Sequence, residues 1–188
     1  MPKSSTATKR TPRTENDNSQ RSENVIVPGL RANEYYPSPS WCVTLILDQV
    51  NLKQPVLDAG AGSGNIYYEV IKRYPNVVGV DIDPKFSPCV TSNYLEYGLD
   101  YGTTIMNPPF SLWMEFVQHA RKNSEHVLAL GRLDMLSSVK RHDFMRDTHP
   151  NVYVLSRRPS FTGDGATDSR SYAWFEWPGE GRWEVLHG

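Results

Sequence analysis

The sequence predicts an α/β fold in which helices cover both faces of a doubly wound, mostly parallel sheet. Short apolar runs alternate with helical patterns along residues 38–155, as in strands joined by crossover helices. A glycine-rich segment, residues 58–64, separates one predicted strand from the helix that follows it. Two late apolar runs have no helix between them, which predicts an antiparallel hairpin at one edge of a seven-stranded sheet.

Each element follows from a local pattern. Residues 38–40, Ser-Pro-Ser, predict a helix start with serine at the cap position, since Trp41, Leu45 and Ile46 then share one face. Further helices are expected over residues 64–74 and 111–123, and a polar helical stretch is expected before the sixth strand. The predicted strands are residues 55–57, 77–80, 90–93, 103–106, 127–130, 152–155 and 172–177.

The first 24 residues differ in composition from the rest of the chain. They are rich in Ser, Thr, Asn, Lys and Arg, so they cannot bury enough apolar surface to offset the entropy of ordering. We expect residues 1–24 to be a disordered polar tail, either simply solvated or touching phosphates. Residues 25–188 are expected to form a single domain.

The bulk composition excludes several classes of protein. The net charge of −1 provides no global basic field. The two cysteines, Cys42 and Cys89, lack the spacing of metal ligands, and no metal site is predicted. Apolar runs stay well short of the roughly 18 residues of a membrane span, and the N-terminus lacks an apolar signal core. We therefore expect a cytoplasmic protein without membrane contact.

The glycine-rich segment has the features of a cofactor-binding turn. Gly60, Gly62 and Gly64 permit positive φ angles and close approach where a strand turns sharply into a helix. Their alternating spacing differs from the Gly-x-Gly-x-x-Gly pattern that holds a diphosphate. Asp58, two residues before the first glycine, suits a cationic or amine-bearing ligand better. Asp81 ends the next strand, where an acid can accept both hydroxyls of a ribose. Together they predict a nucleoside-type cofactor.

The segment Asn107-Pro108-Pro109-Phe110 is the candidate catalytic segment. Its prolines fix the backbone and remove N–H donors, which lets carbonyl groups face a pocket. The Asn107 side-chain oxygen and the Pro108 carbonyl can accept the two hydrogens of an exocyclic amino group, while Phe110 stacks on the ring. Rate would come from positioning and polarisation, without a strong base. The alternative is a plain turn, since Asn-Pro often begins one.

These motifs resemble a known family when taken together. The segment DAGAGSG at 58–64, followed by VDIDP at 80–84, resembles the class I S-adenosylmethionine-dependent methyltransferases. NPPF at 107–110 narrows the resemblance to amino-methyltransferases, chiefly adenine-N6 enzymes of DNA and RNA. The resemblance runs from about residue 35 to 177 and implies a Rossmann-like fold. The small size and the late loop, 157–163, also resemble small DNA adenine methyltransferases of phage type, which would act in the host cytoplasm.

The resemblance implies a role for individual residues. The methionine end of S-adenosylmethionine would lie over the glycine turn, its ribose on Asp81 and its adenine near Asn93, although the family more often has Asp there. Residues 36–39 either resemble the segment that closes over the cofactor or form a proline-rich lead-in to the first helix. The cofactor-binding residues implied are Tyr36, Pro37, Asp58, Ala59, Gly60, Gly62, Gly64, Asp81, Ile82, Asn93, Tyr94 and Asn107.

Substrate contacts are less clearly marked. A target base must leave the stack of a duplex to reach such a pocket, which costs less in a single-stranded or looped substrate. Ser111 and Trp113 are candidates to line the entrance, although Trp113 would equally suit the core. The basic candidates are Arg132, Lys140, Arg141, Arg157 and Arg158, each of which is otherwise a surface charge.

These inferences lead to three hypotheses. The first is an adenine-N6 methyltransferase of DNA, with relaxed or short-sequence specificity because no separate target-recognition domain is expected. The second keeps the chemistry but changes the acceptor to adenine in ribosomal RNA or glutamine in a protein. The third is a cofactor-binding subunit without turnover, and the intact segment at 107–110 argues against it. DNA is favoured over RNA as the partner.

Overall fold

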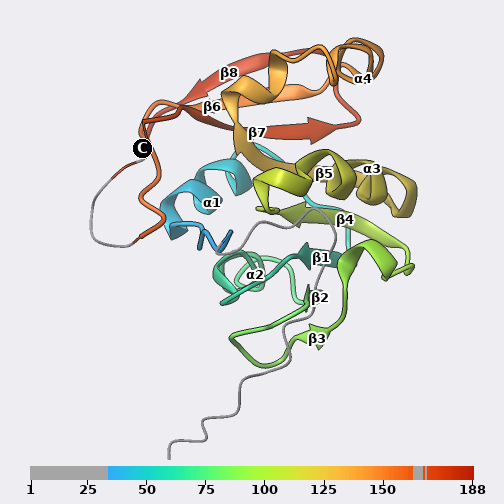
Figure 1. Cartoon of the computed structure of the whole chain (residues 1–188). Coiled ribbons are helices and arrows are strands. Elements are labelled where there is room, and N and C mark those ends of the chain that lie inside the picture. The colour runs from blue at the N-terminus through green and yellow to red at the C-terminus, as the bar shows by residue number, and fades with distance from the viewer. Residues whose placement is uncertain (1–33, 163–166, 168) are drawn as a thin grey trace, which may run out of the picture.

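The computed structural model describes residues 34–162, 167 and 169–188. The predicted tail, residues 1–24, and the predicted start of the domain at residue 25 lie outside this range. One mixed sheet with strand order β3-β2-β1-β4-β5-β7-β6-β8 forms the centre of the molecule (Figure 1). The strands are β1 (Val56–Ala59), β2 (Val77–Asp81), β3 (Val90–Thr91), β4 (Tyr101–Met106), β5 (Ser124–Arg132), β6 (Asn151–Leu155), β7 (Tyr172–Trp177) and β8 (Trp183–Leu186).

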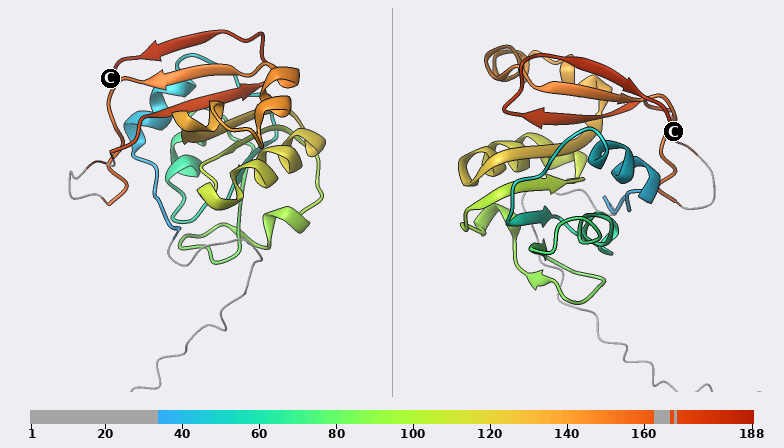
Figure 2. Two further views of the ribbon diagram at one scale, coloured as in Figure 1. Left: turned by 45° about the horizontal axis from the view of Figure 1, so that its top comes forward. Right: turned by 180° about the vertical axis from the view of Figure 1, so that it is seen from behind.

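Helices cover both faces of the sheet, so the domain has three layers (Figures 1 and 2). On one face, α1 and α2 contact each other and pack on the sheet; on the other, α3 packs on β5 with a short 3-10 turn beside it. No helix in the described residues is long and apolar enough to cross a membrane. The helices are α1 (Ser40–Leu47), α2 (Asn65–Val70), α3 (Trp113–Asn123) and α4 (His142–Thr148), and the 3-10 turns are η1 (Tyr94–Glu96), η2 (Phe110–Leu112) and η3 (Leu133–Leu136).

The central strands are buried on both faces of the sheet. All four residues of β1 and all six of β4 are buried. Two buried clusters, one on each face of the sheet, form the core. The amphipathic pattern of α3 directs Trp113, Phe116 and Ala120 into one of them.

The structure confirms the predicted α/β class and the mostly parallel sheet. All seven predicted strands are present, and the last two pair antiparallel as expected. The strand count is one short, because β8 adds parallel to β6 and forms the edge. β8 is only four residues long, its apolar residues are interrupted by Glu184, and three of the four are exposed, as expected for an edge strand. Only β7 runs against the other strands, inserted between β5 and β6.

The predicted start of α1 needs a correction. Pro39 occupies the N-cap position and no side chain caps the helix. Ser38 is buried, and its hydroxyl accepts a hydrogen bond from Asn107 at 3.0 Å. A long-range contact has therefore taken the serine away from the local role predicted for it.

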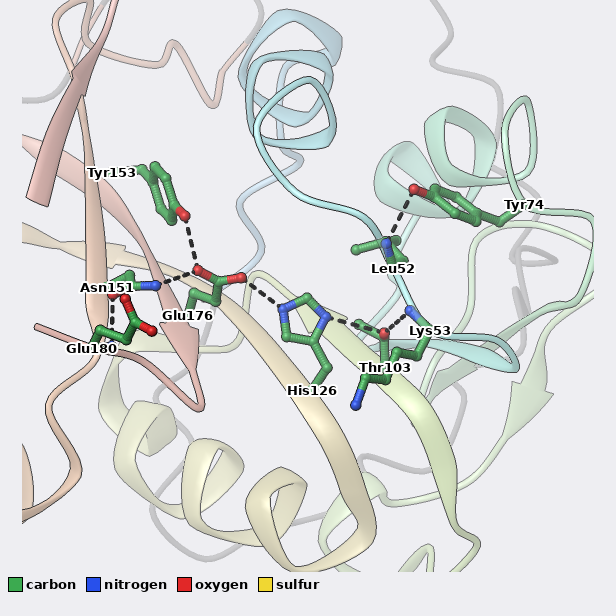
Figure 3. A network of polar contacts seen from close by, with 9 residues as sticks. All are labelled: Leu52, Lys53, Tyr74, Thr103, His126, Asn151, Tyr153, Glu176 and Glu180. Carbon is green, nitrogen blue, oxygen red and sulfur yellow. Dashed lines mark hydrogen bonds and ion pairs between the residues drawn. The ribbon is translucent and has the colours of Figure 1, made fainter. Parts of the chain in front are cut away.

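A polar network at the amino-terminal half of β5 ties the antiparallel part of the sheet to the parallel part (Figure 3). The Glu176 carboxylate accepts from Asn151 and Tyr153, each at 2.8 Å, and lies 2.9 Å from His126 Nε2. His126 Nδ1 lies 3.3 Å from the Thr103 hydroxyl on β4. Side chains from four neighbouring strands are thus joined.

Parallel pairing places the carboxyl ends of most strands at one edge. Ala59, Asp81, Met106 and Arg132 are the last residues of β1, β2, β4 and β5. The start of β7 lies at the same edge, where Tyr172 pairs with Arg132. In open α/β sheets ligands bind outside this edge, and both predicted motifs follow strands that end there.

Candidate cofactor and acceptor site

The glycine turn after β1 adopts the backbone that its sequence predicts. Gly60, Gly62 and Gly64 have φ angles of 74°, 53° and 79°, in the left-handed region that side chains disfavour. Gly60 and Ala61 both donate their N–H to the Val80 carbonyl, at 2.8 and 3.1 Å. The turn is therefore fastened to the adjacent strand β2, and its glycines are required by the backbone.

Two aromatic rings lie against this turn. A Cβ atom on Gly62 would approach the Tyr35 ring to 3.0 Å, and one on Gly64 would approach the Phe86 ring to 2.9 Å. Phe86 also lies beneath Gly79 of β2, where a Cβ would come within 2.8 Å. Phe86 supports the turn from one side, whereas Tyr35 lies over it and is 51% exposed.

Asp58 lies fully buried beneath the glycine turn. Its Oδ2 accepts the Tyr67 N–H of α2 at 2.9 Å, while Oδ1 is buried and makes no hydrogen bond within the described part of the chain. Burial raises the pKa of this carboxyl to about 8; the Tyr67 hydrogen bond opposes the rise and the nearby Asp81 charge adds to it. An unsatisfied buried carboxylate is costly, so this oxygen suits a cationic ligand.

Asp81 fastens the turn in addition to its predicted role. Its Oδ2 accepts the Gly62 N–H and its Oδ1 accepts the Asp83 N–H, each at 2.8 Å. Each carboxylate oxygen keeps a second lone pair, so the predicted contact with a ribose remains open to this group. Ile82 follows it directly and is half-buried.

The Asn107 side chain is held in one orientation. Its Nδ2 donates to the Tyr36 carbonyl at 2.7 Å and to the Ser38 hydroxyl at 3.0 Å. Two acceptors on the same side assign that atom as the amide nitrogen. The other atom, Oδ1, is buried and makes no hydrogen bond within the described residues. Asn107 therefore presents a preoriented acceptor.

Phe110 belongs to a group of aromatic rings beside Asn107. The Tyr36 ring stacks on it with centroids 5.3 Å apart and planes 24° from parallel. The Tyr172 ring lies 5.8 Å from it and the Phe161 ring 6.4 Å. The Arg132 guanidinium lies 4.9 Å from the Phe110 ring centroid, in a cation–π contact. We call Tyr36, Phe110, Arg132, Phe161 and Tyr172 the aromatic cluster.

The two candidates that follow Phe110 have different positions. Ser111 lies at the site, where its N–H donates to a Glu34 carboxylate oxygen at 3.3 Å and its hydroxyl donates to the other oxygen. The prediction that Trp113 lines the entrance is wrong. Its ring is 1% exposed, packs on Phe175 and donates to the Leu130 carbonyl at 2.9 Å, because it begins the buried face of α3.

Asn93 and Tyr94, the residues implied near the adenine, also differ in position. Asn93 caps η1, accepting from the Leu95 N–H at 3.2 Å and donating to Glu96 at 2.8 Å, so its side chain already has local partners. Tyr94, which the resemblance names together with Asn93, has a side chain that is 4% exposed and packs on Phe116 in the core, because the η1 turn directs it inward.

The remaining predicted residues are distributed around the edge. Ala59 and Pro108 are buried, and Pro37 is half-buried between the Tyr36 and Ser38 contacts. Pro109 is the N-cap of η2 and its carbonyl accepts the Leu112 N–H at 2.9 Å. The described residues contain no cluster of three or more His, Cys, Asp or Glu side chains arranged for a metal.

Among the basic candidates, Arg132 belongs to the aromatic cluster. The Arg157 guanidinium instead lies over the Trp41 ring, 4.9 Å from its centroid. Arg158 is exposed. Arg141 donates to the Met135 and Asp134 carbonyls, at 2.9 and 3.1 Å, and so closes the turn after β5.

Several residues at the site belong to none of the sequence motifs described above. Glu34 and Tyr35 precede the first predicted helix and carry no motif. Phe161 lies within the long segment between β6 and β7, and Tyr172 is the first residue of β7. Their signal is weak: Phe161 is one of few apolar residues in that loop, and an isolated aromatic there is a reason to expect a pocket wall.

Strand order, the reversed β7 and a glycine turn at the carboxyl edge together define the architecture. The chain has the fold of the class I methyltransferases. A candidate class I S-adenosylmethionine-dependent methyltransferase from Listeria monocytogenes has this fold, with a TM-score of 0.56, 15% identity, and coverage of 86% of this chain and 68% of that one. A candidate RNA methyltransferase from Pyrococcus horikoshii gives a TM-score of 0.56 and 16% identity over 75% of this chain and 84% of that one.

A third structure with the methyltransferase fold is that of the 23S rRNA methyltransferase ErmE. Its TM-score is 0.55, at 14% identity over 75% of this chain and 68% of that one. No family model and no curated protein matches the sequence. At these identities the shared property is the fold, so the chemistry of the site has to be argued from its own residues.

Proposed function

We propose that this protein transfers a methyl group from S-adenosylmethionine to the exocyclic amino group of adenine in a nucleic acid, with DNA as the first acceptor. The observation that supports this most strongly is the state of Asn107. Its amide nitrogen is fixed by two acceptors, at 2.7 and 3.0 Å, and its buried oxygen has no partner within the described residues. An unsatisfied acceptor beside an aromatic ring suits a planar amine.

The residues after β1 and β2 fit the proposed cofactor. Asp58 offers a buried oxygen, unpartnered within the described residues, to an ammonium group, and the positive-φ glycines let the backbone turn sharply beside it. Asp81 has lone pairs left for ribose hydroxyls. The cofactor, when bound, supplies an electrophilic methyl carbon attached to a positively charged sulfur. The same fold in a Listeria protein named for S-adenosylmethionine supports the assignment.

The chemistry asked of the protein is positioning. Asn107 Oδ1 accepts one amino hydrogen, and the Pro108 carbonyl, on a backbone made rigid by two prolines, accepts the other. These bonds draw the nitrogen toward tetrahedral geometry and aim its lone pair out of the ring plane. Phe110 holds the ring by stacking, with Arg132 beside it at 4.9 Å. Preorganised acceptors of this kind are worth factors of roughly 10²–10³ each in rate.

The aromatic cluster, with its one guanidinium, favours a nucleobase over a glutamine side chain as the acceptor. Stacking of a base on an aromatic ring contributes about 1–3 kcal/mol, which a glutamine amide cannot match. A base has to leave the stack of a duplex to reach this cluster, so single-stranded or looped substrates are expected to react fastest.

The test is a product assay with the full chain and methyl-labelled S-adenosylmethionine. Single-stranded DNA, the same sequence as a duplex, ribosomal RNA and a release-factor-like protein would be separate substrates, each digested to its units after reaction. We expect N6-methyladenine in single-stranded DNA, absent with Asn107→Ala. Label in RNA adenine or in protein glutamine would reassign the acceptor, and no label in any substrate would refute methyl transfer.

A further inference from the structure

Residues 34–38 cross over the carboxyl edge of the sheet and contact both halves of the site. We call this segment the strap. Tyr35 lies over Gly62 of the cofactor turn, Tyr36 stacks on Phe110, and Ser38 accepts from Asn107. The Ser38 carbonyl also accepts from Asn65 of α2 at 2.9 Å, which anchors the end of the strap nearest α1.

The side chains of Glu34 and Tyr36 make contacts of two different chemical kinds. The Tyr36 ring lies nearly parallel to the Phe110 ring, which is the arrangement that a stacked nucleobase adopts. The Glu34 carboxylate accepts hydrogen bonds from both the N–H and the hydroxyl of Ser111, the residue after Phe110. The oxygens of a phosphate could accept the same two hydrogen bonds, since carboxylate and phosphate oxygens both accept charge-assisted hydrogen bonds from such donors.

Asn107 supports the same interpretation from a third direction. The strap's Tyr36 carbonyl and Ser38 hydroxyl hold its amide nitrogen, and its oxygen is sealed from solvent without a partner in the described residues. In this structure an incoming amino group therefore cannot reach the oxygen. The acceptor's place is covered by a flat ring and an anionic group, which are the two parts of a nucleotide.

We propose that Glu34 and Tyr36 are an internal stand-in for the acceptor nucleotide, so that Phe110 and Ser111 form adjacent subsites for its base and its phosphate. The side chains of Glu34 and Tyr36 have to leave both subsites before a nucleotide can enter, while the Tyr36 carbonyl and the Ser38 hydroxyl keep their hydrogen bonds with Asn107. This inference rests on the proposed function, because it takes the aromatic cluster as the acceptor site. It adds to that function a phosphate subsite at Ser111, and it makes Glu34 and Tyr36 competitors of the acceptor nucleotide.

Binding of small nucleotides tests the proposal without turnover. The probes are adenosine and its 5′- and 3′-monophosphates, measured by equilibrium dialysis against the full chain. Saturating S-adenosylhomocysteine keeps the probes out of the cofactor half. Because no methyl transfer is needed, failure of the proposed chemistry in the product assay stays distinguishable from failure here.

Three variants separate the subsites. Glu34→Gln removes the competing charge, so at least one monophosphate should bind three- to tenfold more tightly while adenosine is unchanged. Tyr36→Ala uncovers Phe110 and should tighten adenosine and the monophosphates at least threefold. Ser111→Ala in the Glu34→Gln background should abolish the gain for the monophosphate. Tyr35→Ala is the matched control, because that ring contacts Gly62 instead of Phe110.

Several results would overturn the proposal. Weaker binding of adenosine to Tyr36→Ala would mean that Tyr36 contacts the bound base instead of making way for it. An equal effect of Glu34→Gln on adenosine and the monophosphates, or none, would remove the phosphate subsite. Absence of measurable binding in every variant would refute the stand-in altogether. Tyr36→Leu, which keeps bulk without aromaticity, repeats the test if the alanine variant folds poorly.

Discussion

The Asn107 side-chain amide donates to the backbone carbonyl of Tyr36 at 2.7 Å, across 71 residues of sequence. This bond joins the segment after β4 to the segment before α1 and leaves the amide oxygen as the group that faces an acceptor. Replacing Asn107 by Ala should lower the rate constant for methyl transfer by roughly 10²–10³ and leave cofactor affinity nearly unchanged. Single-turnover kinetics and calorimetry would measure the two quantities.

Ser38→Ala is the control for that experiment. It removes the second acceptor of the Asn107 amide but keeps the Tyr36 carbonyl and Asn107 Oδ1, so the loss in rate should be much smaller. A full rate in Asn107→Ala, or equal losses in both variants, would contradict the role assigned to Oδ1.

Phe110 should control acceptor affinity through stacking. With Phe110→Ala, KM for a single-stranded acceptor should rise by about 5- to 150-fold, as expected from roughly 1–3 kcal/mol of stacking. Phe110→Trp keeps a stacking face and should stay near wild type. Steady-state kinetics over acceptor concentration would show the effect, and an unchanged KM in the alanine variant would remove Phe110 from the acceptor site.

Asp58 should make stability depend on pH in a recognisable direction. The folded pKa is raised to about 8, whereas an unfolded aspartate ionises near pH 3.9. Between these values the folded chain retains a proton that the unfolded chain has released, so the free energy of unfolding falls as pH rises. Relative to Asp58→Asn, wild type should lose about 1.4 kcal/mol per pH unit between about pH 5 and 7.

Urea unfolding of both proteins across that pH range measures the difference. S-adenosylhomocysteine should reduce the slope, because its ammonium group favours the ionised carboxylate. Parallel stability curves for wild type and Asp58→Asn would show that Asp58 is ionised throughout.

Glu176 should have the opposite pH dependence. Burial alone would raise its pKa, but hydrogen bonds from His126, Asn151 and Tyr153 outweigh burial and lower it. A lowered folded pKa contributes stability above the unfolded value near 4.3, and that stability is lost as pH falls through the folded pKa. Glu176→Ala should cost about 1–3 kcal/mol at pH 7, since it leaves buried donors without an acceptor.

The cost of Glu176→Ala should shrink below about pH 4, as measured by urea unfolding. The exposed side chain of Glu180 provides the control, and Glu180→Ala should change stability little at either pH. A pH-independent cost for Glu176→Ala would indicate that packing, and not the charge, supplies its contribution.

Gly64 should not tolerate a side chain. Its φ of 79° disfavours an L-residue, and a Cβ would lie 2.9 Å from the Phe86 ring. We expect Gly64→Ala to destabilise the fold by about 1–3 kcal/mol and to weaken cofactor binding, because the turn would shift. Gly98→Ala is matched, since a Cβ there meets nothing within 4 Å. Equal melting temperatures of the two variants would contradict this account.

The sequence by itself determined the parts of this protein that depend on local patterns. Period and apolar runs predicted seven strands, and the alternating glycines predicted positive φ angles that the turn adopts. The edge strand β8 was not predicted, because it is only four residues long and its place depends on pairing with β6. Local patterns leave Trp113 either at the entrance or in the core, and the resemblance names Tyr94 with Asn93; the turns η2 and η1 direct both side chains into the core.

Only the tertiary structure decided how the Asn107 amide is oriented and what lies on Phe110. Both depend on Tyr36 and Ser38, which are distant in sequence and reach the site because α1 packs beside α2 at the carboxyl edge of the sheet. Local patterns act over a few residues, whereas these contacts form when the sheet brings strand ends together. For that reason the sequence could nominate Asn107 and Phe110, while the strap that covers them emerged only from the fold.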